Sequence, residues 1–146
     1  MLPSFASDLD ASRLKRHLFF LVVVCATLLF TGYNYGVFDE AMHVPFLKAN
    51  VNPALYPGDP MIALKDVYYS YFWYFFEPFA KLGWLEPALF VVHVATIYLS
   101  YWAIWNLSRG LFDDPLSALY SVLAFIVPHF GFVGFPVFEF APLSRT

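Results

Sequence analysis

The stretch LFFLVVVCATLLFTGYNY, residues 18–35, decides the fold class of this chain because it contains no charged side chain. As an α-helix rising 1.5 Å per residue it extends about 27 Å, close to the roughly 30 Å hydrocarbon core of a bilayer. Three basic residues, Arg13, Lys15 and Arg16, precede it. We therefore predict a transmembrane helix near residues 17–36.

A cleaved signal peptide is the competing interpretation of this stretch, because a basic region precedes an apolar one. Residues 30–35, however, offer no pattern of small residues typical of a cleavage site. Tyr33 and Tyr35 instead suit the membrane interface, where aromatic rings with polar tips are enriched. We therefore favour a span that is retained.

The composition of the whole chain also indicates a membrane protein. Of its 146 residues, 60% are hydrophobic and only 13% are charged, whereas soluble domains carry about 25% charged residues. The formal net charge of -3 is small and the basic residues are scattered, so we expect no nucleic-acid partner. The single cysteine, Cys25, can form no internal disulfide.

Two further spans are predicted in the second half of the chain. Residues 87–107 are uncharged and predict a helix near residues 86–108. A third span is predicted near residues 115–135, with Asp114 as its N-cap and Pro115 at its first position. The predicted fold class is therefore all-α, a polytopic integral membrane protein with about three transmembrane helices.

The connection between the first two spans, residues 36–84, is too polar and too rich in proline to cross a bilayer. Loops this long are usually functional. Aromatic residues recur at helical spacing in residues 67–82, which predicts a helix that lies in the membrane interface and is interrupted at Glu77-Pro78. A short spanning helix is the alternative interpretation of that segment.

The orientation follows from basic residues in short flanking segments, which accumulate on the cytoplasmic side. Arg13, Lys15 and Arg16 flank the first span and Arg109 ends the second. We therefore expect residues 1–16 and 109–114 to be cytoplasmic, and the connection 36–84 to be extracytoplasmic.

An acidic pair, Asp39 and Glu40, follows the first span, with His43 three residues further on. Carboxylates beside a membrane are costly unless they face water, a partner or a substrate. They suit a general base that takes a proton from an acceptor hydroxyl, or a divalent cation shared with a phosphate. A di-iron site needs a second Glu-x-x-His motif, which the chain lacks. A helix cap is the structural alternative.

The stretch FDEA, residues 38–41, resembles the acidic motif of the GT-C glycosyltransferases, such as protein mannosyltransferases and aminoarabinose transferases. The stretch LYPGDP, residues 55–60, also resembles a loop of bacterial members. The resemblance implies a lipid-linked sugar donor, a bacterial inner-membrane location and Asp39 as the base, with Glu40 orienting Asp39 or the acceptor. His43 stands one residue too far along to match the histidine of the mannosyltransferase pattern.

Four residues of the connection are candidates for substrate binding: His43, Lys48, Asp59 and Lys65. The lysines can meet a donor phosphate as point charges, although each also fits a solvated loop. A divalent cation is the one cofactor considered, and no metal ligands are assigned. His93 lies within the second span, where a histidine either serves function or bonds to a neighbouring helix.

We expect residues 1–146 to form one transmembrane region, the amino-terminal part of a larger enzyme, because GT-C enzymes have many more spans. That enzyme is expected to transfer a sugar from a lipid-linked phosphate donor to an acceptor hydroxyl at the extracytoplasmic face, and the fragment alone is expected to be inactive. Its expected partners are the bilayer and the donor; protein partners are unassigned. The alternatives are a small non-catalytic accessory subunit of a membrane complex, or a transporter in which Asp39 and His43 relay protons.

Overall fold

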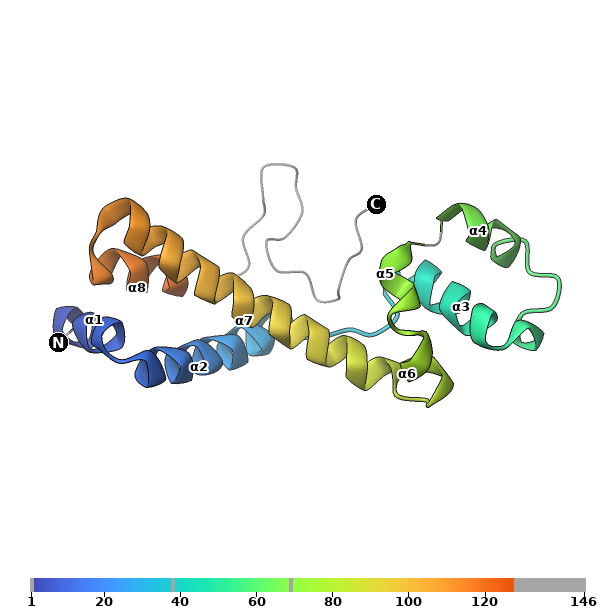
Figure 1. Ribbon diagram of the computed structural model, residues 1–146, viewed down its shortest axis with the longest axis horizontal. Coiled ribbons are helices and arrows are strands. Elements are labelled where there is room, and N and C mark those ends of the chain that lie inside the picture. Colours follow the sequence, from blue (N-terminus) through green and yellow to red (C-terminus); the bar gives the residue numbers. More distant parts are fainter. Residues whose placement is uncertain (1, 38, 69, 128–146) are drawn as a thin grey trace. The chain divides into compact units, whose positions relative to one another are not determined.

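The computed structural model describes residues 2–37, 39–68 and 70–127, and over these residues every regular element is a helix. The all-α prediction is confirmed. The chain divides into two compact units (Figure 1). One contains residues 2–32 and 94–127 of the described chain, and the other contains the described residues between 33 and 93.

Helix α2, Arg13–Thr31, corresponds to the first predicted span. It begins after Ser12, whose side chain accepts a hydrogen bond from the Lys15 backbone N–H. It ends at Gly32, whose φ of 73° is a left-handed value that glycine adopts readily. The helix therefore stops five residues before the predicted limit of 36.

Helix α7, Leu85–Phe112, contains the second predicted span and extends beyond it. Among the described residues, α2 and α7 are the two helices long and apolar enough to cross a membrane. Only 28% of the most apolar 18-residue window of each is buried. The core helix of a soluble protein is mostly buried, so this exposure favours contact with lipid.

Helix α8, Pro115–Ala124, begins where the third span was predicted. The Asp114 cap is confirmed, because its carboxylate accepts hydrogen bonds from the backbone N–H groups of Leu116 and Ser117 at 3.2 and 2.7 Å. With 10 residues, α8 is about 15 Å long and too short to cross a bilayer. The rest of the predicted span, beyond residue 127, lies outside the described residues.

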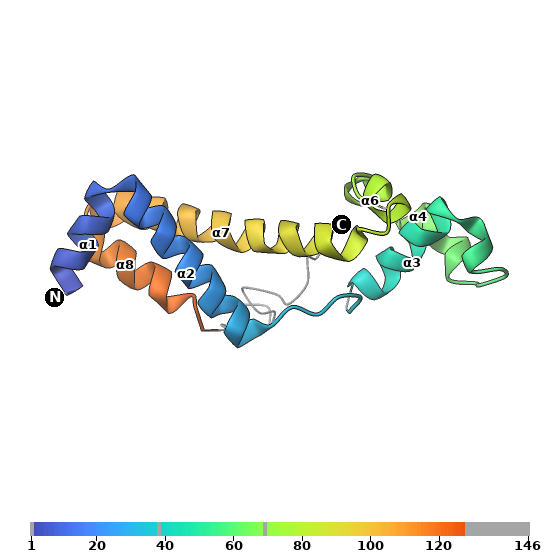
Figure 2. The same cartoon turned by 90° about the horizontal axis from the view of Figure 1, so that it is seen from below.

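The core of the first unit joins α2 to the later part of α7. Tyr101 and Trp105 of α7 are almost completely buried. The Tyr101 hydroxyl lies 2.6 Å from the Thr27 hydroxyl of α2 and donates a hydrogen bond to the Phe125 carbonyl. Helix α1, Leu2–Ala11, packs beside α8 in the same unit (Figure 2).

Asp10 of α1 holds the two basic helix ends together. The Arg109 guanidinium donates to both carboxylate oxygens of Asp10 at 3.0 and 3.1 Å, and Arg16 lies 3.9 Å from the same carboxylate. The end of α7 therefore lies beside the start of α2. This arrangement supports the prediction that residues 1–16 and 109–114 share one side.

The second unit differs most from the sequence prediction. Its longest described helix within the connection is α3, Asp39–Val51, whose extent was not predicted. The 3₁₀ turns η1, Pro53–Leu55, and η2, Ile62–Leu64, follow it. The helix predicted over residues 67–82 is broken more often than predicted. The structure has the short helices α4, Lys65–Tyr68, α5, Tyr71–Tyr74, and α6, Glu77–Lys81, and only the start of α6 coincides with the predicted interruption at Glu77-Pro78.

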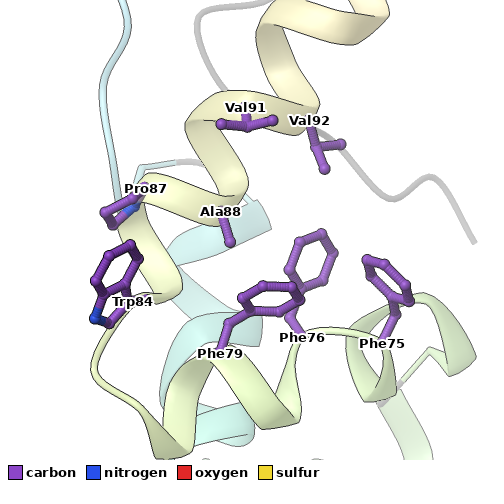
Figure 3. A pocket seen from close by; sticks show the side chains of 8 residues that line it. All are labelled: Phe75, Phe76, Phe79, Trp84, Pro87, Ala88, Val91 and Val92. Atoms are coloured by element: carbon purple, nitrogen blue, oxygen red, sulfur yellow. The ribbon is translucent and has the colours of Figure 1, made fainter.

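Local side chains explain the breaks between these short helices. The Ser70 hydroxyl caps α5 by accepting from the Phe72 backbone N–H, and Pro78 lies in the first turn of α6, where proline is tolerated. The aromatic rings of this region line an apolar pocket of about 370 Å³ (Figure 3), where Phe76 and Phe79 lie opposite Ala88 of α7.

Candidate functional site

Glu40 is a buried carboxylate at the start of α3. Its side chain is 0% exposed, and its Oε2 accepts a hydrogen bond from the Gly36 backbone N–H at 2.7 Å. Its Oε1 is buried without a hydrogen-bond partner among the described residues. Burial raises the pKa of Glu40, the Gly36 bond opposes that rise, and Glu86 adds to it. Glu40 therefore holds the turn before α3 and does not face water.

Asp39, its neighbour, is only partly buried. Adjacent helical residues point about 100° apart, so the two carboxylates cannot share one environment. The charge of Asp39 raises the pKa of His43, one turn further along the helix. Asp39 is thus the less buried carboxylate of the pair, and the buried His43 imidazole lies one turn further along the same helix.

His43 is 3% exposed, and its ring stacks on the Trp73 ring with centroids 5.2 Å apart and an interplanar angle of 21°. Burial lowers the pKa of His43 more than Asp39 raises it, so the structure favours the neutral imidazole. Its Nδ1 has no hydrogen-bond partner among the described residues. A neutral ring beside Asp39 can accept or relay a proton.

Of the two candidate lysines, Lys48 lies in the last turn of α3 and Lys65 begins α4. The Lys48 ammonium lies 5.9 Å from the centroid of the Tyr35 ring. The Lys65 ammonium donates a hydrogen bond of 2.8 Å to the Asn50 side chain. Asn50 is about 16 Å along the helix axis from Asp39. The structure therefore does not bring Lys65 to the acidic pair.

Asp59 has a local structural partner. Its carboxylate accepts a hydrogen bond from the Met61 backbone N–H at 2.8 Å, the two-residue pattern of an Asx turn. Asp59 therefore shapes the turn before η2 within the second unit, and the substrate-binding role predicted for it stays a prediction.

A second group of polar side chains lies where Tyr33 meets α7. The Tyr33 ring lies 5.3 Å from the His93 ring and 5.1 Å from the Phe90 ring, between centroids. Within the described residues, the Tyr33 hydroxyl and His93 Nε2 are buried without hydrogen-bond partners. Burial and the charges of Glu40 and Glu86 raise the pKa of Tyr33.

Sequence reasoning selected His93 but missed Tyr33 and Glu86. The sequence does indicate that Glu86 belongs with His93, because Glu86, Phe90 and His93 are four and three residues apart and therefore share one face of α7. Nothing in the sequence indicates that Tyr33 packs against that face.

No group of three or more His, Cys, Asp or Glu side chains that could hold a metal ion occurs within residues 2–37, 39–68 and 70–127.

No protein-family model, curated protein or solved structure matches this chain. The class of protein is defined by the structure alone: an all-helical chain in which two helices are long and apolar enough to cross a membrane, with an acidic pair at the start of α3.

The opposite pKa shifts of Glu40 and His43 predict opposite pH effects on stability. A lowered histidine pKa destabilises the folded state as pH falls below the ordinary value of 6.5. A raised glutamate pKa destabilises it as pH rises above the ordinary value of 4.5. Relative to the unchanged protein, His43→Phe should therefore gain melting temperature towards acid pH, and Glu40→Gln should gain it towards neutral pH.

The measurement is the melting temperature of the detergent-solubilised protein and both variants between pH 4.5 and 8.5. Differences between variant and parent that stay constant with pH would show that neither side chain is held in its neutral form.

Proposed function

We propose that the chain is an integral membrane protein of a bacterial cell membrane, with α2 and α7 as spans and its amino terminus in the cytoplasm. Support comes from the exposed apolar surface of both helices and from the packing of Thr27 in α2 against Tyr101 in α7. That packing gives α2 a structural role, which favours a retained span over a cleaved signal peptide.

We further propose that the chain is the amino-terminal part of a membrane glycosyltransferase, which transfers a sugar from a lipid-linked phosphate donor to an acceptor hydroxyl at the extracytoplasmic face. One observation carries the proposal: Glu40 is completely buried, while the adjacent Asp39 is only partly buried and lies one helical turn before His43. This leaves one carboxylate free for proton transfer, held on the first turn of a packed helix.

In the proposed reaction the acceptor oxygen bonds to the anomeric carbon of the sugar while the bond from that carbon to the lipid phosphate breaks. Asp39 takes the proton of the acceptor hydroxyl as its oxygen becomes the nucleophile. The lipid phosphate leaves with the bonding electron pair. Glu40 positions Asp39 through the turn that it closes with Gly36.

The test is transfer of labelled sugar from a panel of polyprenyl-phosphate donors, using membranes that contain the full-length protein. We expect product formation that depends on Asp39. Absence of transfer from every donor by a correctly inserted, folded protein would contradict the proposal.

The topology makes a separate prediction. In a Cys25→Ser background, a cysteine in place of Asp59 should react with an impermeant maleimide added to intact cells. Gly110→Cys should react only after the membrane is opened, and it fits because nothing lies within 4 Å of the added Cβ. Labelling of Asp59→Cys from the cytoplasmic side alone would overturn the topology.

A further inference from the structure

A groove of about 470 Å³ lies between α1 and α2 in the first unit. Four of its lining residues, Lys15, Leu18, Phe19 and Val22, are spaced three, one and three residues apart and therefore share one face of α2. Helix α1 supplies the opposite wall with Phe5, Asp8 and Leu9. The groove thus has an apolar body with one basic and one acidic side chain at its end.

The body of the groove suits a hydrocarbon chain. Its apolar side chains offer no hydrogen bonds, and Leu18 and Val22 are 54% and 66% exposed, so the groove opens onto the surface of a helix that we propose to be a span. A hydrocarbon chain has no polar group to desolvate there, whereas an extended peptide would leave backbone groups unpaired. The volume lies within the roughly 300–1,000 Å³ range of ligand pockets.

The end of the groove suits a headgroup that carries both charges. Lys15 Nζ and Asp8 Oδ2 lie 3.1 Å apart, and their side chains are 59% and 65% exposed. Exposed ion pairs contribute little to stability, so each partner can exchange the other for a ligand group. Lys15 would meet a phosphate and Asp8 an ammonium group. An anionic headgroup without a cation would instead bring its phosphate beside the Asp8 carboxylate.

The depth of these groups along α2 fits the same ligand. Lys15 lies near the start of α2 and Val22 lies about 10.5 Å further along the helix axis. A headgroup at Lys15 therefore places the upper part of its acyl chain against Leu18, Phe19 and Val22.

We propose that the groove between α1 and α2 binds one phosphatidylethanolamine molecule, with its phosphate on Lys15, its ammonium on Asp8 and an acyl chain in the apolar body. A primary ammonium donates hydrogen bonds to a carboxylate, which the trimethylammonium of phosphatidylcholine cannot do. The inference rests on the proposal that α2 spans a membrane and is independent of sugar transfer.

The test is native mass spectrometry of the full chain in equimolar phosphatidylethanolamine, phosphatidylcholine and phosphatidylglycerol. We expect phosphatidylethanolamine to be retained most, and Asp8→Asn to lower its preference over phosphatidylglycerol about two- to fivefold. Lys15→Gln should lower retention of all three phospholipids, because each carries the phosphate that Lys15 would contact. Arg13→Gln is the matched control, because Arg13 is exposed and does not line the groove.

Equal retention of the three lipids, or the same change in Asp8→Asn as in Arg13→Gln, would overturn the site. Alkaline carbonate extraction separates this failure from failure of the span. A chain that resists extraction but shows no preference contradicts the groove alone, whereas a chain released by carbonate contradicts the membrane assignment of α2.

Discussion

Asp39→Asn is expected to lower sugar transfer by about 10²- to 10⁴-fold, the usual contribution of a general base. The amide keeps the shape of the side chain but removes its basic oxygen. Asp39 lies on the first turn of α3, beside a carboxylate that is buried and bonded to Gly36, so the substitution should leave the helix in place. The measurements are the initial rate at saturating donor and, separately, the affinity for the donor. We expect the variant to lose turnover and to keep donor binding.

Two further variants make this result specific. Asp66→Asn removes an exposed acidic group from α4 in the same unit and should retain the parental rate. Parental turnover in Asp39→Asn together with loss in Glu40→Gln would move the role to Glu40. Full activity in both would leave the pair as a helix cap.

The elements predicted well from the sequence are those governed by local rules. An uncharged run predicts α7 because length and apolarity alone are needed to match a bilayer. Asp114 followed by Pro115 predicts the start of α8 because both act within one helical turn. The length of α8 was not predictable in the same way, since the apolar pattern continues past the turn that starts at Phe125.

The second unit was predicted less well because tertiary packing decides it. The sequence of α3 contains Pro45, an unfavourable residue in a helix interior, and its buried residues Val44 and Leu47 pack against side chains more than 25 positions away. The aromatic periodicity of residues 67–82 favoured one helix. The chain instead turns at Phe75 and Phe76, and Trp73 and Phe76 are both buried there.

The candidate site was predicted in part. The adjacency of Asp39 and Glu40 follows from the sequence, and two adjacent residues on a helix point about 100° apart, so only one of them can face a reacting centre squarely. Which one is buried does not follow, because it depends on Gly36 turning its N–H towards Glu40. The stack of His43 on Trp73 joins residues 30 positions apart, and no local pattern encodes that contact.

Trp73→Ala is expected to destabilise the second unit by about 3–5 kcal/mol, the usual cost of removing a buried tryptophan or phenylalanine ring. The Trp73 side chain is 0% exposed and belongs to the same buried cluster as Leu47 of α3 and Leu89 of α7. Its loss leaves a cavity between these helices and removes the ring on which His43 stacks. The effect is measured as the change in the free energy of unfolding, obtained from hydrogen exchange at the backbone amides of α3.

Trp84→Ala is the matched control, since Trp84 belongs to the same unit but is 66% exposed at the pocket drawn in Figure 3. An exposed substitution usually changes stability by less than about 0.5 kcal/mol, so α3 should keep its protection from exchange. Equal loss of protection in both variants would show that α3 does not depend on the Trp73 cluster. Loss of protection in Trp73→Ala alone would show that this cluster stabilises α3, the helix that carries Asp39. The Trp73→Ala variant should then lose sugar transfer through unfolding, although its Asp39 carboxylate is chemically intact.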